Sequence, residues 1–100
     1  MTIVKVKFLV GLADADAWDG KHLRKVTGYG HGNWAEPGTE AVALLVEPDV
    51  WLVTFRWYKA LLMTTEAAKV FLKSEERLEM TPELEEHLKN YEYMKEHAKK

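Results

Sequence analysis

The sequence predicts a small α+β domain, and three observations lead to that prediction. The run at 50–58 is dense in β-branched and aromatic residues, which fit a pleated strand better than a helix. Residues 40–46 also have strand character and precede a Glu-Pro-Asp turn, so 40–58 is expected to be an antiparallel hairpin. Residues 82–100 are expected to form a helix that begins at a Thr-Pro pair, Thr81 and Pro82. We therefore expect a small antiparallel sheet of three or four strands packed on two or three helices.

A chain of 100 residues makes one domain, here residues 1–100. It buries about two thirds of its unfolded surface, which is enough for one core. The apolar runs are far shorter than the ~20 residues that cross a bilayer. The N-terminus alternates apolar and basic residues and lacks the continuous apolar centre of a secretory signal. We expect a cytoplasmic protein with no membrane partner.

Composition narrows the function classes. The chain has no cysteine, which excludes disulfides, thiolate metal sites and cysteine nucleophiles. Few thermolabile residues with plentiful Glu and Lys is a bias reported for hyperthermophile proteins, and it indicates a thermophilic source or a virus of one. The net charge is −2, and no segment has the positive bias of a duplex-binding surface.

The first third of the chain predicts one strand and leaves one element open. Residues 3–10 alternate apolar and basic side chains, as in a strand with one solvated face. Residues 14–27 carry an apolar helical stripe that Gly28 is suited to end, but Gly20 costs about 1 kcal/mol inside a helix. Both a helix and a turn followed by a strand remain open there. Residues 28–38 have glycine at alternating positions and predict a loop.

The strand at 50–58 has two different faces, because successive side chains point to opposite sides. The face expected to meet the core carries Trp51, Val53, Phe55 and Trp57. The other face carries Leu52, Thr54, Arg56 and Tyr58. That mixed face is either a second buried layer or a contact surface.

The second half of the chain predicts two helices. Residues 59–63 either extend the preceding strand or lead into the next element. Thr64 or Thr65 is expected to cap a helix that runs through Leu78. Thr81 begins a second helix, whose apolar stripe recurs at helical spacing over Leu84, Leu88, Tyr91, Met94 and Ala98. The nearest architecture is a ferredoxin-like one, with this C-terminal helix in place of the last strand.

Candidate chemistry is sparse. Glu83 and His87 lie four residues apart and are able to supply two metal ligands, but a site needs three or four. We therefore expect them to lie on a solvated helix face. His31 titrates near neutral pH, but a lone loop histidine is weak support for a general base. We expect no catalytic residue, no metal site and no cofactor.

The leading hypothesis is a non-catalytic protein–protein interaction or regulatory module, with a second copy of the chain as one partner. It rests on a surplus of apolar surface, since both faces of strand 50–58 and the stripe of the last helix must be covered. Trp, Tyr and Arg are the residue types that anchor interfaces. The candidate partner-binding residues are Tyr29, His31, Trp34, Leu52, Arg56, Tyr58 and Tyr91.

Two alternatives belong to other classes. Aromatic and basic residues interleave at Tyr29, Arg56, Tyr58 and Lys59, a combination that holds single-stranded nucleic acids. Separately, Ala-Glu-Pro-Gly before a strand, a hairpin ending in Arg-Trp and a following helix make residues 34–72 similar to antibiotic-biosynthesis-type monooxygenases. That resemblance implies a small dimeric α+β barrel acting on aromatic polyketides or haem, and it assigns no catalytic residue.

Overall fold

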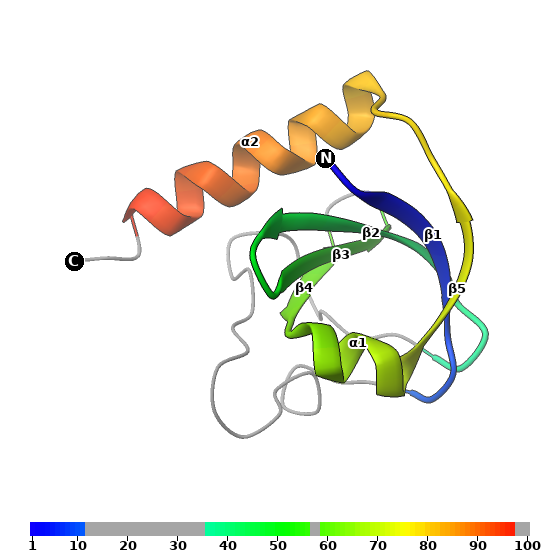
Figure 1. The fold of residues 1–100 in the computed structure, drawn as a ribbon. Coiled ribbons are helices and arrows are strands. Elements are labelled where there is room, and N and C mark those ends of the chain that lie inside the picture. Colours follow the sequence, from blue (N-terminus) through cyan, green and yellow to red (C-terminus); the bar gives the residue numbers. More distant parts are fainter. Residues whose placement is uncertain (12–35, 57–58, 98–100) are drawn as a thin grey trace.

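The computed structural model describes residues 1–11, 36–56 and 59–97. In this part of the chain, five strands form one antiparallel sheet in the order β4-β3-β2-β1-β5, with two helices. The strands are β1 (Ile3–Phe8), β2 (Glu40–Glu47), β3 (Val50–Arg56), β4 (Lys59–Met63) and β5 (Leu72–Arg77). The helices are α1 (Thr65–Phe71) and α2 (Pro82–His97). Figure 1 shows a strongly curled sheet, with α1 bridging from β4 to β5 and α2 lying across the outer, convex side.

The predicted central hairpin is confirmed as β2–β3. Its register places Leu44 opposite Leu52, and the connecting turn holds Asp49 at a positive φ of 64°. Asp tolerates this left-handed conformation better than most residues, which suits it to the turn. The segment at 59–63 turns back as β4 and pairs antiparallel with β3.

The first predicted strand is confirmed as β1, two residues shorter than expected. It lies between β2 and β5 rather than at an edge of the sheet. Val6 and Phe8 point into the concave core, whereas Lys5 and Lys7 are half-buried on the opposite face. The expected solvated face is therefore partly covered.

The prediction of a helix running through Leu78 is wrong beyond Phe71. Thr64 caps the helix as expected, since its hydroxyl accepts a hydrogen bond from the Ala67 N–H at 3.1 Å. The helix then ends because Leu72 turns extended, with φ −122° and ψ 146°, and buries its side chain in the concave core. The following residues satisfy their backbone groups by pairing with β1, so tertiary pairing overrides the helical pattern of the sequence.

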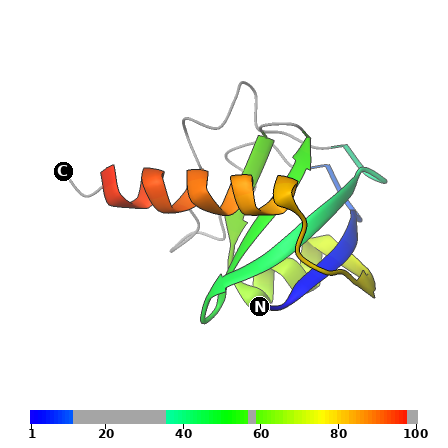
Figure 2. The same ribbon diagram turned by 90° about the horizontal axis from the view of Figure 1, so that it is seen from above.

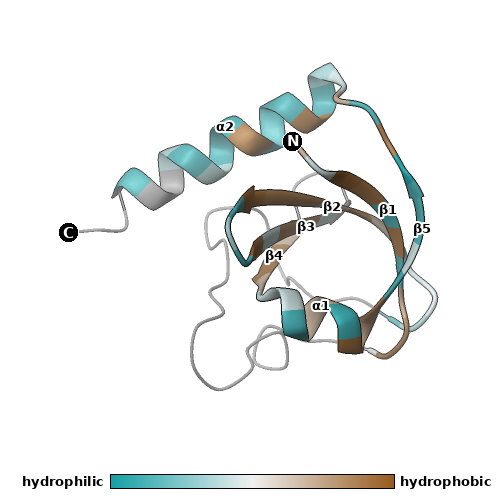
Figure 3. Ribbon diagram, viewed as in Figure 1, coloured by the Kyte–Doolittle hydropathy of each residue, from teal (hydrophilic) through white to brown (hydrophobic). Residues whose placement is uncertain are grey.

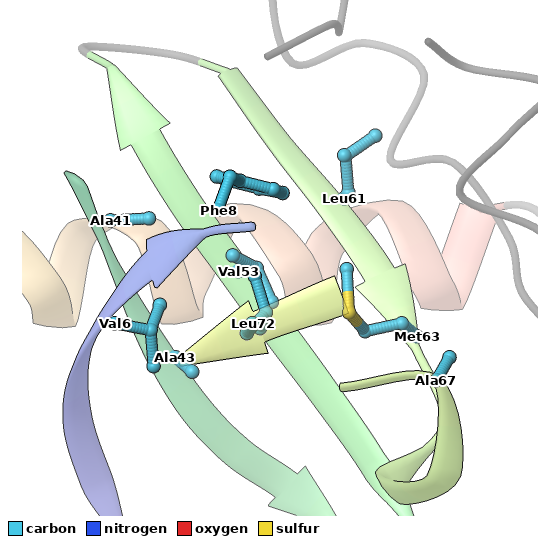
Figure 4. Packing of buried hydrophobic residues seen from close by; sticks show 9 residues of the cluster. All are labelled: Val6, Phe8, Ala41, Ala43, Val53, Leu61, Met63, Ala67 and Leu72. Carbon is cyan, nitrogen blue, oxygen red and sulfur yellow. The ribbon is translucent and has the colours of Figure 1, made fainter. Parts of the chain in front are cut away.

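The core has two layers, one on each side of the sheet. Figure 4 shows the concave layer, formed by Val6, Phe8, Ala41, Ala43, Val53, Leu61, Met63, Ala67 and Leu72. The convex layer lies under α2 and contains Ile3, Leu44, Leu52, Ala60, Leu84 and Tyr91. In Figure 3 the hydrophobic colour follows β1, β2 and β3, while β5 is mostly hydrophilic. The mixed face of β3 is thus a second buried layer over its described side chains.

The number of strands differs from the prediction, and the predicted architecture is not confirmed. The sheet has five strands in the described residues rather than three or four, and neither the ferredoxin-like relation nor a helix in place of the last strand is confirmed. The segment 14–27 and the loop up to residue 35 lie outside the described residues. Among the helices that are described, none is long and apolar enough to cross a membrane.

Candidate interaction surface

Two of the predicted partner-binding residues meet inside the molecule. Leu52 on β3 is fully buried, and Tyr91 on α2 is 6% exposed and packs in the same cluster. The described part of the helix stripe, Leu84, Leu88 and Tyr91, therefore docks on this chain's own sheet rather than on a partner. Figure 2 shows α2 lying across the strands, consistent with that packing. Neither residue lies on a free surface.

A hydrogen bond from the Tyr91 hydroxyl also joins α2 to the sheet. The hydroxyl donates to Glu47 Oε2 at 2.6 Å, which joins α2 to the end of β2. Burial, the hydrogen bond and the nearby carboxylates raise the pKa of Tyr91 well above its ordinary value of 10.0. The phenol therefore stays protonated and keeps donating throughout the neutral range.

His87 is not on a solvated face, contrary to expectation. Its side chain is 7% exposed on the side of α2 that faces the sheet. Burial lowers its pKa below the ordinary value of 6.5, and Glu83 and Glu86 oppose that shift. The ring is therefore held neutral at pH 7, which fits a histidine in an apolar layer. Within the described residues, no group of three or more potential metal-ligating side chains exists.

The remaining predicted residues have no described side chains. Tyr29, His31, Trp34 and Tyr58 lie outside the described residues. Arg56 ends β3, but its side chain is not among those described. Leu52 and Tyr91 are thus the members of the predicted set whose side chains the structure describes, and it places both in the core.

A different surface emerges from the exposed apolar side chains. Among the described residues, six large apolar side chains stay exposed: Met1, Leu9, Val10, Val70, Met80 and Tyr93. All but Tyr93 flank the β1–β5 pair. At one end, the Leu9 N–H donates to the Phe71 carbonyl oxygen at 2.8 Å, which joins the segment of Leu9 and Val10 to the residue that follows Val70. At the other end, the Leu78 N–H donates to the Ile3 carbonyl oxygen at 2.9 Å, and Met1 and Met80 each lie two residues along the chain from that bond.

We call this surface the β5 margin; it comprises Lys73–Arg77 with the exposed apolar residues at its two ends. The strand itself is charged, and all of its side chains after Leu72 are exposed. Lys7 on β1 lies 4.0 Å from the Glu75 carboxylate, and Lys5 lies 3.9 Å from Glu40. Each lysine of β1 therefore has an acidic neighbour, and the described margin is a mixed surface rather than a basic stripe.

Sequence reasoning missed this surface for a physical reason. Residues 72–77 have one apolar side chain followed by five polar ones, so they lack the alternation that identifies a half-buried strand. The one available signal was the pair Val70 and Met80, apolar residues on either side of a charged run. Comparisons with known proteins add nothing further: no protein family, no curated protein and no solved structure matches the chain.

Proposed function

We propose that this chain is a non-catalytic protein-interaction module that binds through the β5 margin. One observation carries the proposal: five of the six large apolar side chains that stay exposed in the described residues lie at the ends of the β1–β5 pair. Grouped apolar exposure on a small domain is typical of a contact site, whereas single exposed residues are ordinary. The charged strand between the two apolar ends supplies the polar contacts that fix orientation.

The proposal moves the contact surface away from the one that the sequence favoured. Leu52 on β3 and Tyr91 on α2 pack against one another in the core. These two predicted contact residues are therefore not available to a partner. Val70, by contrast, is 61% exposed in the last turn of α1, two residues before β5 begins. A partner that covers Val70 and Leu9 therefore removes apolar surface from water without unfolding any part of this chain.

Quantitative capture experiments test this proposal. The full chain is immobilised, exposed to an extract of its native host, and compared with a Leu9→Lys/Val70→Lys double variant. Tyr93→Lys serves as the matched control, because Tyr93 is 62% exposed but lies on α2. We expect the wild type and the control to retain the same proteins, including further copies of this chain, and the double variant to lose them. Equal retention by all three proteins contradicts the proposal.

A further inference from the structure

We propose that β5 pairs antiparallel with β5 of a second copy of this chain, across a two-fold axis between Ser74 and Glu75. This inference rests on the proposed function and names the partner for it. Two-fold self-association is the commonest form of homo-oligomer, and edge strands are the usual place for a sheet to grow between chains. In the described residues β5 pairs with β1 alone and so ends the sheet. Figures 1 and 2 both show α2 running away from this side of the molecule.

The outer edge of β5 carries backbone N–H and C=O groups that face away from β1. Successive residues of a strand turn their N–H and C=O groups to opposite edges. The Phe71 carbonyl faces β1 because it accepts from Leu9, so Leu72 faces away. The Leu78 N–H faces β1 because it donates to Ile3, so Arg77 also faces away. The Leu72 N–H donates to the Ala68 carbonyl oxygen at the end of α1, so Leu72 offers only its carbonyl to a second strand. Arg77 offers both its N–H and its carbonyl, and the Arg77 N–H of each copy is therefore able to donate to the Leu72 carbonyl of the other.

A bulge makes the strand symmetric. The β1–β5 register shifts by one residue between Lys5 and Val6, because β5 contains one extra residue there. Lys73 lies opposite Lys7 and Glu76 lies opposite Lys5, and residues that are directly paired share a face of the sheet. Since Lys5 and Lys7 are two apart on β1, Lys73 and Glu76 lie on one face although they are three apart in sequence.

Charge then selects the register. An axis between Ser74 and Glu75 sets Leu72 opposite Arg77 of the second copy and Lys73 opposite Glu76. Ser74 and the extra residue Glu75 lie at the axis itself. The Lys73–Glu76 pair occurs twice by symmetry, on the face where both side chains are exposed. Within one chain, Lys73 lies opposite the like-charged Lys7 of β1. The dimer gives Lys73 a carboxylate neighbour, Glu76 of the second copy.

The neighbouring registers are less favourable. An axis through Glu75 sets Glu75 against its own copy and Lys73 against Arg77, which places like charges together. An axis through Ser74 sets Lys73 against Glu75, whose carboxylate already lies 4.0 Å from Lys7. It also sets the outward-facing Leu72 against Glu76, which faces β1. The charges and the bulge discourage pairing with unrelated strands, so the edge is selective for its own copy.

The apolar ends of the margin complete the fit. Antiparallel pairing brings the start of one β5 to the end of the other. Val70 and Leu9 at the start therefore approach Met80 and Met1 of the second copy at the end. Val70 is 61% and Met80 is 37% exposed in the single chain, so each gains cover from the other. The contact thus combines a hydrogen-bonded strand pair with two small apolar clusters.

Sedimentation equilibrium with charge-swapped variants tests the register. The wild type should shift with concentration from 11.5 kDa toward twice that mass. Lys73→Glu alone sets Glu against Glu, and Glu76→Lys alone sets Lys against Lys. Each is expected to weaken dimerisation about tenfold, because two pairs change from attraction to repulsion. A mixture of the two variants restores both pairs, so it should dimerise as tightly as the wild type.

The control pair is Glu66→Lys with Lys89→Glu, which makes the same charge changes at exposed positions of α1 and α2. These variants should dimerise like the wild type, both singly and mixed. A wild type that stays at 11.5 kDa at every concentration overturns the self-pairing, and so does a mixture that associates no better than its components. If the chain does not dimerise but still captures other proteins in a way that the Leu9→Lys/Val70→Lys variant abolishes, the self-pairing is wrong and the proposed function is supported. A dimer that Lys73→Glu weakens, with no capture of other proteins, assigns the margin to self-association.

Discussion

The Tyr91 hydroxyl donates to Glu47 Oε2 at 2.6 Å, and this hydrogen bond joins α2 to the last residue of β2. The turn that follows β2 contacts the other helix. The Thr65 N–H at the start of α1 donates to Asp49 Oδ1 at 2.9 Å, and the Trp51 indole N–H donates to Thr65 Oγ1 at 3.0 Å. Residues 47–49 thus contact both helices, one on each side of the sheet.

Removing the Tyr91 hydroxyl should loosen α2. Tyr91→Phe keeps the buried ring and deletes the donor, so the free energy of unfolding should fall by about 1–2 kcal/mol. A double-mutant cycle with Glu47→Gln, measured by urea denaturation, isolates the pairwise contribution. If the two substitutions prove additive, the hydrogen bond contributes nothing to stability.

Strongly alkaline solution should act on the same contact. Because the folded-state pKa of Tyr91 lies above its ordinary value of 10.0, the unfolded chain loses its proton first as the pH rises. The contribution of Tyr91 is therefore complete below pH 10 and declines above it. Tyr91→Phe should show a shallower decline in urea midpoint over that range, and identical slopes would contradict this assignment.

His87 should make stability sensitive to mild acid. Its folded-state pKa lies below 6.5, so the unfolded chain takes up the proton first as the pH falls through that value. The contribution of the neutral ring is present above pH 6.5 and is lost as the pH drops through the lower folded-state pKa. His87→Gln should flatten this slope just below pH 6.5 relative to the wild type. The carboxylates titrate in both proteins, so an unchanged slope would show that His87 is not the group responsible.

Two adjacent residues give the clearest test of the concave core. Phe8 is 1% exposed in that core, whereas Leu9 is 51% exposed at the β5 margin. Phe8→Ala should lower the free energy of unfolding by about 3–5 kcal/mol. Leu9→Ala should change it by no more than about 0.5 kcal/mol. Similar losses at both positions, measured by thermal or urea denaturation, would contradict the packing described above.

The sequence predicts best where local chemistry and tertiary packing agree. The β2–β3 hairpin was predictable because a Pro-containing turn separates two apolar strands. The start of α2 was predictable because Thr81 caps it, with its hydroxyl accepting from the Leu84 N–H at 3.2 Å. Both signals lie within a few residues of the structure that they determine.

The rest depends on contacts between segments far apart in the chain. Residues Lys73–Arg77 suit a helix by composition, and they become a strand because β1 offers an edge to pair with. The burial of His87 and Leu52 likewise depends on how α2 crosses the sheet, which no local pattern specifies. The candidate contact surface was missed for the same reason, since it consists of residues brought together by the β1–β5 pair.

Amide hydrogen exchange as a function of protein concentration tests the role of the β5 margin most directly. The Arg77 amide turns away from β1, so in a single chain it exchanges with solvent. The Leu72 amide already donates to the Ala68 carbonyl oxygen and serves as an internal control. We predict that the Arg77 amide becomes protected as concentration rises, while the Leu72 amide and the amides in β2 and β3 keep their exchange rates. Exchange at Arg77 that is independent of concentration would contradict pairing at this edge.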